Sequence, residues 1–306
     1  MSVASQAPLV SVIVPVLNGM PTLAMLLAQL DQQTYPREKW EIIVVDNGST
    51  DGSRELVEQF VAERPWARLV HELRRGPSAA RNAGVRASRG QILTFIDSDC
   101  IPGPQWLVEL VGAFSDRTVW AAGGLLKSAA PSTLTEAFSA RQEILNQEDF
   151  FKERPYKPPF LLTANFAVRR PVFERVGFFD ETLCVGEDAD FCWRILEAGG
   201  KLALVRRAIV AHRHRSTLRS FARQMFLYGI GSATTFARHR EFIGHKVWLD
   251  VTSYRSLLKA IVKALLYPII KRDPYLRREG WLELVRYACF LAGRFVGSCR
   301  NRVVCL

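Results

Sequence analysis

Two aspartates separated by one residue follow a short apolar segment before the middle of the chain. The segment covers residues 91–96, and Asp97-Ser98-Asp99 comes directly after it. If the segment is a strand, the chain bends after it, and the two carboxylates can bind one hard divalent cation. Mg²⁺ and Mn²⁺ prefer such oxygen ligands. The triplet therefore predicts a cation site completed by phosphate oxygens and water, with a solvated acidic turn as the alternative.

Polar and turn-forming residues also follow two earlier apolar segments. Residues 15–19 (PVLNG) follow the first, and residues 46–52 (DNGSTDG) follow the second. An aspartate after a strand, such as Asp46, is most often a helix cap. Three segments that all end in such residues instead predict one common edge of a sheet, where ligands bind beyond the carboxyl ends of parallel strands.

Two predicted helices begin with charged residues that could act on an anionic substrate. Residues 74–84 (RRGPSAARNAG) form a basic loop that runs into a helix, and Arg81 with the first helical amides suits a diphosphate. Glu187 and Asp188 begin another helix, whose positive end favours ionised carboxylates. A solvent-facing arginine and a simple helix cap are the respective structural alternatives.

Two histidines lie in the basic run of residues 212–215 (HRHR). On an extended segment, side chains two residues apart point the same way, so His212 and His214 would both face a metal or a phosphate. A basic strand end at the surface is the alternative. The sequence does not decide which histidine would serve.

Short apolar segments alternate with helical patterns around these residues, which predicts a parallel sheet with helices on both faces. The expected strands are residues 9–16, 41–45, 68–71, 91–96, 119–126, 161–168, 202–205 and 209–212. The expected helices are residues 22–33, 53–63, 78–87, 106–114 and 188–198, with Asp51 or Ser53 as the N-cap of the second. Residues 150–160 are expected to form a proline-rich loop.

Taken together, the motifs resemble those of the family 2 glycosyltransferases. The matching segments are PVLNG, VVDNGSTDGS, GPSAARNAG, FIDSD, FDE and GEDADFCWR, with the spacing of that family, over about residues 9–230. The resemblance implies a GT-A fold, which is an α/β fold with a Rossmann-like, mostly parallel sheet flanked by helices. It also implies inverting transfer of one sugar from a nucleotide-diphosphate sugar, most often a UDP-sugar, to an acceptor hydroxyl.

The resemblance further implies roles for individual residues. Donor-binding residues are expected to be Pro15, Asn18, Asp46, Arg81, Asp97 and Ser98. Ligands of Mn²⁺ or Mg²⁺ are expected to be Asp99, His212 and His214. Asp188 is expected to be the general base that takes the acceptor proton, with Glu187 and Asp190 as minor candidates. Residues 223–229 (RQMFLYG) depart from the Q-x-x-R-W motif of processive synthases, which favours transfer of a single sugar.

Composition places the chain among globular proteins, with 48% hydrophobic and 23% charged residues. Its six cysteines form no C-x-x-C pair, which fits reduced thiols in the cytosol. Prolines at positions 8, 15 and 21 interrupt the apolar N-terminal run, so we expect a strand and a loop there and no signal peptide.

Positive charge is concentrated in the last third of the chain. Residues 201–306 hold 21 Lys and Arg against 5 Asp and Glu, a net charge of +16, although the whole chain carries only +11. Such asymmetry suggests an anionic partner. Residues 255–270 and 281–299 are basic and apolar, but neither offers about 20 uninterrupted apolar residues. They predict helices at a membrane interface, with a helical cap on the catalytic domain or an oligomer interface as alternatives.

These observations predict a GT-A catalytic domain over residues 1–215 and a basic amphipathic helical region over residues 216–306. The expected location is cytoplasmic, peripheral at the inner face of the membrane, with a glycan or lipid-linked acceptor. A non-enzymatic nucleotide-sugar-binding scaffold is the second hypothesis, but such a protein should have lost some of the acidic residues. Nucleic-acid binding is not expected, because no recognition module is present.

Overall fold

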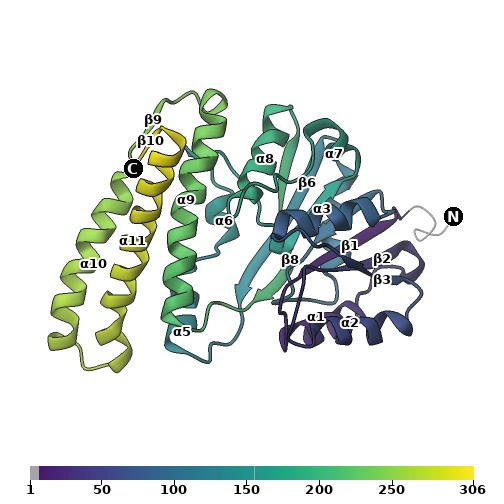
Figure 1. The fold of residues 1–306 in the computed structure, drawn as a ribbon, viewed down its shortest axis with the longest axis horizontal. Coiled ribbons are helices and arrows are strands. Elements are labelled where there is room, and N and C mark those ends of the chain that lie inside the picture. The colour runs from purple at the N-terminus through teal and green to yellow at the C-terminus, as the bar shows by residue number, and fades with distance from the viewer. Residues whose placement is uncertain (1–6, 155) are drawn as a thin grey trace.

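The computed structural model describes residues 7–154 and 156–306, and its core is an eight-stranded sheet (Figure 1). The first six residues of the N-terminal run and Pro155 of the predicted loop lie outside this description. The strand order is β3-β2-β1-β4-β7-β6-β8-β5. The strands are β1 (Val10–Val16), β2 (Trp40–Asp46), β3 (Ala67–His71), β4 (Ile92–Phe95), β5 (Cys100–Pro102), β6 (Val119–Ser128), β7 (Phe166–Arg169) and β8 (Lys201–His212).

The N-terminal half of the sheet is parallel, as the alternating pattern predicts. β1 pairs in parallel with β2 and β4, and β2 pairs in parallel with β3. The carboxyl ends of β1, β2 and β4 therefore lie at the same edge. Beyond β4 the sheet is mixed, because β7 runs antiparallel to β4 and β6, β8 runs parallel to β6, and β5 runs antiparallel to β8.

Alternate residues of β1 enter two apolar cores, one on each face of the sheet. Val12 and Val14 pack in the core that includes α1 (Thr22–Leu30), α2 (Ser53–Ala62) and α4 (Trp106–Gly112). Ile13 packs in the other core, which includes α3 (Pro77–Ala87), α7 (Pro171–Val176) and α8 (Glu187–Glu197). Both faces are thus covered by helices.

The structure differs locally from the sequence prediction. The expected strand at residues 161–168 begins only at Phe166, because Thr163–Asn165 forms a 3-10 turn. The two strands expected at residues 202–205 and 209–212 are one strand, β8, which continues across an irregularity in its pairing with β6. The N-cap of α2 is Gly52, at φ +89°, and is neither Asp51 nor Ser53. The short helices α5 (Leu134–Arg141) and α6 (Gln147–Phe150) were not expected.

Three long helices lie beside the sheet in the C-terminal region: α9 (Leu218–Ile243), α10 (Val251–Ile270) and α11 (Pro274–Asn301) (Figure 1). α9 packs against both α8 and α11, and α11 also contacts α5. A small apolar core joins α5, α9 and α11 through Phe138, Phe221 and Leu282. α10 packs on α11, at the side away from the sheet. For residues 281–299 the packing of α11 on α9 and α5 matches the alternative of a helical cap, whereas α10, which includes residues 255–270, packs on α11.

Over residues 7–154 and 156–306, no helix has both the length and the apolar character that a membrane span requires. The chain ends in a short parallel pair of strands, β9 (Val247–Trp248) and β10 (Val304–Cys305), which joins the ends of the helical region.

Glycines allow the backbones of α9 and α11 to approach each other. A Cβ added at Gly293 would lie 2.0 Å from the carbonyl oxygen of Phe226, and one added at Gly229 would lie 2.1 Å from that of Phe290. We expect Gly293→Ala to lower the free energy of unfolding by about 1–3 kcal/mol, the usual effect of overpacking, as measured by urea denaturation.

The matched control for this substitution is Gly112→Ala. Gly112 has helical backbone angles and open space at its Cβ position among the described residues, so alanine there should be neutral or stabilise by up to about 1 kcal/mol. Equal stabilities of the two variants would contradict the close packing of α9 on α11.

Candidate active site

The Asp97-Ser98-Asp99 turn lies between β4 and β5, and β5 connects it to β8. Cys100 pairs with His212 across β5 and β8. This pairing places Nε2 of His212 3.6 Å from Oδ1 of Asp99. A histidine far along the chain thus meets the second aspartate of the triplet because two strand ends are paired.

The donor atoms around Asp99 fit a divalent cation. Asp99, Cys100 and His212 offer ligand atoms that all lie within 4.8 Å of one another. In octahedral coordination at about 2.1 Å, two ligands of one ion lie about 3 to 4 Å apart, and 3.6 Å falls in this range. Nδ1 of His212 is buried and has no hydrogen-bond partner among the described residues. The Cys100 thiol is fully buried and is a poor ligand for a hard ion, which leaves Asp99 and His212.

His214 takes a different position from His212. Its ring lies 5.6 Å from the His212 ring, and its Nε2 is 2.8 Å from the Ser128 hydroxyl oxygen. The geometry therefore favours His212 over His214 as the histidine beside the metal site, a choice that the sequence left open.

A cleft of about 680 Å³ opens at the carboxyl ends of the strands. Of the residues expected from the sequence, its wall includes Pro15, Asn18, Arg81, Asp97, Ser98, Asp99 and His214. His212 lines a neighbouring cavity of about 320 Å³, which His214 also borders. Asp46, Glu187 and Asp188 line neither of these two cavities. The volume and the charged wall suit a ligand of nucleotide size.

The loop after β1 is fastened to the loop after β2 by hydrogen bonds. The Asn18 side-chain oxygen accepts a hydrogen bond from the backbone amide of Thr50, and the backbone amide of Asn18 donates to the Ser49 hydroxyl. Asn18 adopts φ +54°, the left-handed conformation that asparagine tolerates better than most residues. Its place in the wall of the cleft is therefore fixed by a sharp turn.

Asp46 is buried behind the cleft. Its carboxylate accepts hydrogen bonds from the Ser49 amide and from the Arg54 guanidinium, 2.9 Å away. Burial alone would raise the pKa of Asp46, but these hydrogen bonds lower it. The neighbouring Asn47 reaches the cleft instead, where its side-chain oxygen accepts a hydrogen bond from the Gly76 amide at the start of α3. The role of Asp46 at a nucleotide base stays a prediction.

Arg81 connects the two acidic motifs. Its guanidinium donates to Glu187 Oε1 at 2.7 Å and to Asp97 Oδ1 at 3.1 Å. Burial opposes its charge, but the carboxylates of Asp97, Glu187 and Asp188 raise the pKa of Arg81 above its ordinary value. The sequence suggested a phosphate contact for Arg81, and the structure shows a bridge between carboxylates at the wall of the cleft.

Three acids lie at the start of α8: Glu187, Asp188 and Asp190. Among the described residues, Asp188 is the one of the three that has no cationic partner. Glu187 pairs with Arg81, and Asp190 pairs with Arg194 and His239. Asp188 accepts a 2.7 Å hydrogen bond from the Thr163 hydroxyl. Burial and the charge of Glu187 raise the pKa of Asp188 to about 7, although Arg81 opposes this shift. A carboxylate with that pKa is suited to accept a proton near neutral pH.

Other residues of the site were missed by the sequence analysis. The wall of the cleft includes Arg213, Arg215, Ser216 and Thr217 from the segment between β8 and α9, and Ser220 from the first turn of α9. Thr163 contacts Asp188 from the 3-10 turn that had been read as strand. The basic run that contains the two histidines was the signal for Arg213 and Arg215, whereas no local pattern indicates Thr163.

Comparisons with known proteins agree with this geometry. A family model described as glycosyl transferase family 2 matches residues 11–177. The chain is 36% identical over 304 residues to the glycosyltransferase AglE of Haloferax volcanii, which covers 96% of this chain and 93% of that protein. It is 33% identical over 239 residues to the pre-mycofactocin glycosyltransferase of Mycobacterium tuberculosis, which covers 75% of this chain and 48% of the relative.

Solved structures share the fold at lower identity. The mannosyltransferase PcManGT from Pyrobaculum calidifontis, in complex with GDP-Man and Mn²⁺, matches 98% of this chain and 76% of its own, with a TM-score of 0.60 and 21% identity. GalNAc-T7 with UDP, GalNAc and Mn²⁺ matches 98% of this chain and 55% of its own, with a TM-score of 0.56 and 19% identity. These likenesses show a GT-A-like fold. The family model and the AglE likeness, together with the acidic residues at the strand ends, show that this chain is a glycosyltransferase of family 2.

Proposed function

We propose that this glycosyltransferase moves one sugar from a nucleoside diphosphate sugar to an acceptor hydroxyl, with inversion and with Asp188 as the general base. The proposal rests on a difference in cationic partners and pKa between the three acids at the start of α8, Glu187, Asp188 and Asp190. Glu187 and Asp190 are neutralised by cations, whereas Asp188 has a pKa of about 7 and only a hydroxyl donor. In the proposed reaction the Asp188 carboxylate takes the proton of the acceptor hydroxyl as its oxygen attacks the anomeric carbon.

The proposed donor site is the cleft at the strand ends. Asn18, Asn47 and Ser98 offer uncharged polar groups in its wall, and Asp97 and Asp99 lie at its floor beside Arg81. The structural neighbours that carry GDP-Man or UDP support a nucleotide sugar as the ligand. We propose a UDP-sugar as the first donor to test, and GDP-mannose as the second.

Asp99 and His212 are the residues that would bind Mn²⁺ or Mg²⁺ in this proposal. Such an ion would neutralise the diphosphate that leaves when the sugar is transferred. Two protein ligands leave coordination positions for phosphate oxygens. The Mn²⁺ in the two neighbouring structures supports manganese as the ion to test first.

The base role predicts a specific pH dependence. Asp188 accepts a proton only when ionised, so kcat should rise as the pH increases through about 7. Asp188→Asn should lower kcat by about 10²-fold, the scale of general-base assistance, with donor affinity nearly unchanged. Steady-state kinetics from pH 5 to 9 measure both effects. Full turnover by Asp188→Asn would move the role to Glu187.

The metal role predicts that Asp99→Ala abolishes Mn²⁺-dependent donor binding in titration calorimetry while the circular dichroism spectrum stays unchanged. The fold should survive, because the Asp99 side chain is partly exposed and makes no ion pair with Lys or Arg among the described residues. Glu63→Ala is the matched control, since it also removes a carboxylate but from an exposed side chain that lines neither cavity. Undiminished turnover in EDTA would contradict a metal-assisted reaction.

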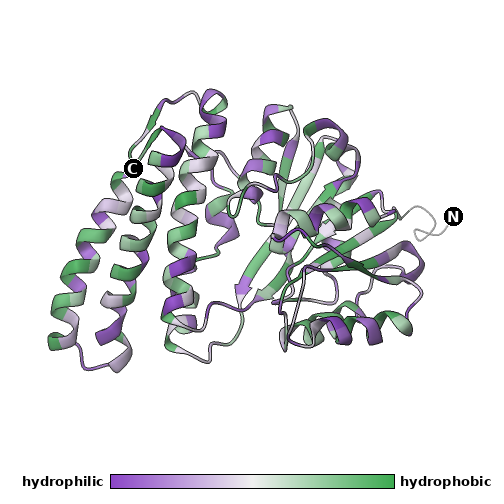
Figure 2. Cartoon of the chain, in the orientation of Figure 1, coloured by the Kyte–Doolittle hydropathy of each residue, from purple (hydrophilic) through white to green (hydrophobic). Residues whose placement is uncertain are grey.

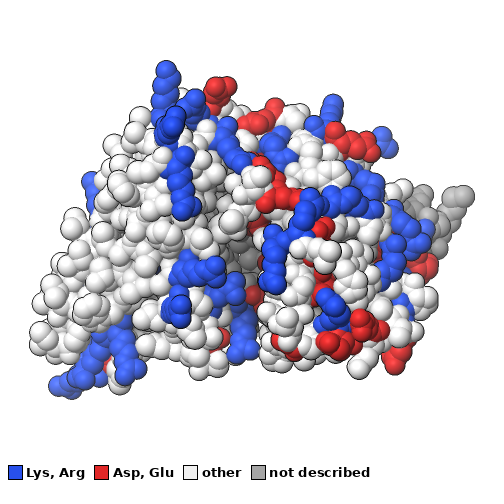
Figure 3. Space-filling model, in the orientation of Figure 1, with Lys and Arg blue, Asp and Glu red and all other residues white. Residues whose placement is uncertain are grey.

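The outer face of α10 supports peripheral contact with a membrane. Apolar side chains recur there at helical spacing and are exposed, among them Leu258, Leu265 and Ile269, the last of which is 79% exposed. Figure 2 shows the apolar character of this helix, and Figure 3 shows a largely uncharged surface over α10 with Lys and Arg at the lower end of the helices. A contiguous exposed apolar face of this kind marks an interaction site.

We propose an anionic lipid surface as the partner of this face. α10 contains no Asp or Glu, and its exposed Arg255 and Lys259 complement anionic head groups, whereas Lys263 pairs with Glu283 of α11. The anionic lipids of the cytoplasmic leaflet attract each nearby Lys or Arg by about 1 kcal/mol. An acceptor linked to a lipid would then be presented at the same surface. Contact at the inner face of the membrane is part of this proposal.

The triple variant Leu258→Ser, Leu265→Ser, Ile269→Ser should lose most of its binding to phosphatidylglycerol vesicles in sedimentation assays. Its fold should be unchanged, because these side chains are exposed. Leu73→Ser is the control, since Leu73 is 92% exposed on the catalytic part of the chain. High salt should release only part of the wild-type protein, because the apolar contribution is not screened. A lipid-free dimer that the triple variant dissociates would overturn the membrane proposal and assign the face to a second copy of the chain.

A further inference from the structure

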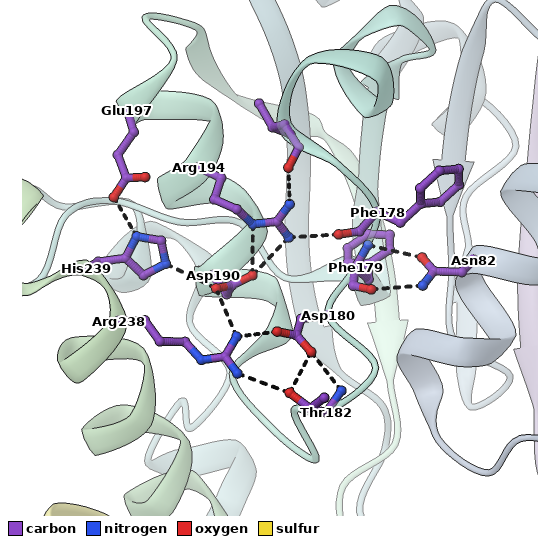
Figure 4. Close-up of polar contacts among 11 residues, drawn as sticks. Asn82, Phe178, Phe179, Asp180, Thr182, Asp190, Arg194, Glu197, Arg238 and His239 are labelled. Carbon is purple, nitrogen blue, oxygen red and sulfur yellow. Dashed lines mark hydrogen bonds and ion pairs between the residues drawn. The ribbon is translucent and has the colours of Figure 1, made fainter. Parts of the chain in front are cut away.

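A polar cluster with a buried centre fastens α9 to α8 (Figure 4), and its residue Asp190 lies two positions after the proposed base on α8. We name it the α8–α9 cluster, and its members are Asp180, Asp190, Arg194, Glu197, Arg238 and His239. At its centre, Nε2 of His239 lies 3.1 Å from Asp190 Oδ1, and Nδ1 lies 2.6 Å from Glu197 Oε1. Both partners are carboxylates, which only accept hydrogen bonds. Both ring nitrogens are therefore placed to donate, which favours the cationic imidazolium form of His239.

The second Asp190 oxygen is bound by Arg194, one helical turn later. Nε and Nη2 of Arg194 lie 3.0 and 2.9 Å from Asp190 Oδ2. Arg194 also donates to the carbonyl oxygens of Val176, the last residue of α7, and of Phe178 in the segment between α7 and α8. Both oxygens of Asp190 are thus fixed, one from α8 itself and one from α9.

Arg238, the neighbour of His239 on α9, extends the cluster to the same segment. Its guanidinium pairs with Asp180 and donates to the Thr182 hydroxyl. Asn82 of α3 binds this segment from the other side, through two hydrogen bonds with the backbone of Phe179. The cluster therefore connects α3, the segment before α8, α8 and α9.

Buried charges are costly to desolvate unless they are fully paired. The side chains of His239 and Asp190 are only 5% and 4% exposed. α9 also departs from helical backbone angles at His239, with φ −105° and ψ 15°. Two apolar side chains in place of His239 and Asp190 could fill the contact between α8 and α9 without burying charge. The orientation of α8 therefore explains the cluster better than packing alone does.

We infer that His239 is a positioning residue for Asp188. Asp188 and Asp190 are two positions apart on α8, so their side chains leave the helix about 200° apart, on opposite sides. Fixing Asp190 from α9 sets the rotation of α8 that directs Asp188 toward Thr163. A displacement of about 1 Å in a reacting group can reduce a rate by about 10²-fold. This inference rests on the proposed role of Asp188 and adds a residue that does not touch the substrate.

The positioning of Asp188 by His239 should depend on pH, because His239 can lose its proton. Burial opposes protonation, but the hydrogen bonds and charges of Asp190 and Glu197 raise the pKa of His239 above its ordinary value. Arg194 and Arg238 are the other charged groups that face Asp190 in the cluster. Because the pKa of His239 is raised in the folded protein, the stabilisation of the fold by charged His239 is fully present below about pH 6.5. This stabilisation is lost as the pH rises through the pKa of His239 in the folded protein. In the proposed reaction Asp188 accepts protons above about pH 7, and kcat should decline once the pH passes the raised pKa of His239 in the folded protein.

The test uses His239→Ala in the full chain, with UDP-sugars and GDP-mannose as donors and MnCl₂ present. We expect kcat to fall at least tenfold, KM for the donor to change less than twofold, and the alkaline decline of kcat to disappear. Arg240→Ala is the matched control: it removes an exposed cation next to His239 on α9 and should keep the wild-type pH profile. Calorimetric donor binding should be equal in all three proteins.

A second variant covers the outcome in which His239→Ala does not fold. Glu197→Gln keeps the imidazole and removes one of the two carboxylates that raise its pKa, and the Glu197 side chain is 35% exposed. It should move the alkaline decline of kcat to lower pH. An unchanged pH profile in Glu197→Gln, or a stably folded His239→Ala with wild-type kcat, would overturn the inference. Failure of the base assignment is distinguishable, because it would show as wild-type turnover in Asp188→Asn whatever the result at His239.

Discussion

A buried guanidinium between two carboxylates is the interaction on which the site depends. Arg81 comes from α3, Asp97 from the end of β4 and Glu187 from the start of α8, so one side chain joins three elements. Such a charge is tolerated in a low-dielectric interior only if it is fully paired. One cation faces three acids here, and the negative charge that remains favours the protonated form of Asp188. Burial is the largest cause of the raised pKa of Asp188, the proposed base; within the bridge, Glu187 adds to this rise and Arg81 opposes it.

Much of the catalytic half could be predicted from the sequence because its signals are local. Runs such as residues 42–45 are apolar on both faces and are followed by aspartate and glycine, which marks a buried parallel strand and its edge. β1, β2 and β4 are parallel neighbours, so the motifs that follow them had to converge. That convergence places Asn18, Asp97 and Asp99 in one cleft.

The other parts of the fold and of the candidate site depend on contacts between residues far apart in the sequence, which no local sequence pattern reveals. His239 stands in a basic stretch that reads as a solvent-exposed helix, yet it is buried between Asp190 and Glu197. The antiparallel insertion of β7 and the 3-10 turn that brings Thr163 to Asp188 are likewise set by tertiary packing. α11 contacts α5 and α9, whereas the outer face of α10 is exposed. Hydrophobic periodicity could not reveal this difference, because both segments are basic and apolar.

The contacts across the predicted boundary at residue 215 show why the helical region matters to the reaction. α10 packs on α11, α11 packs on α9, and α9 is fastened to α8 by charged hydrogen bonds that reach Asp190. Gly186, at φ +92°, has room for no side chain, because a Cβ there would lie 2.7 Å from the Thr235 hydroxyl oxygen of α9. The start of α8, which carries the proposed base, is therefore shaped by a helix that the sequence assigns to the other region. A lipid surface that orients α10 would orient the same rigid stack of helices, and the acceptor would approach Asp188 from a direction fixed by the fold.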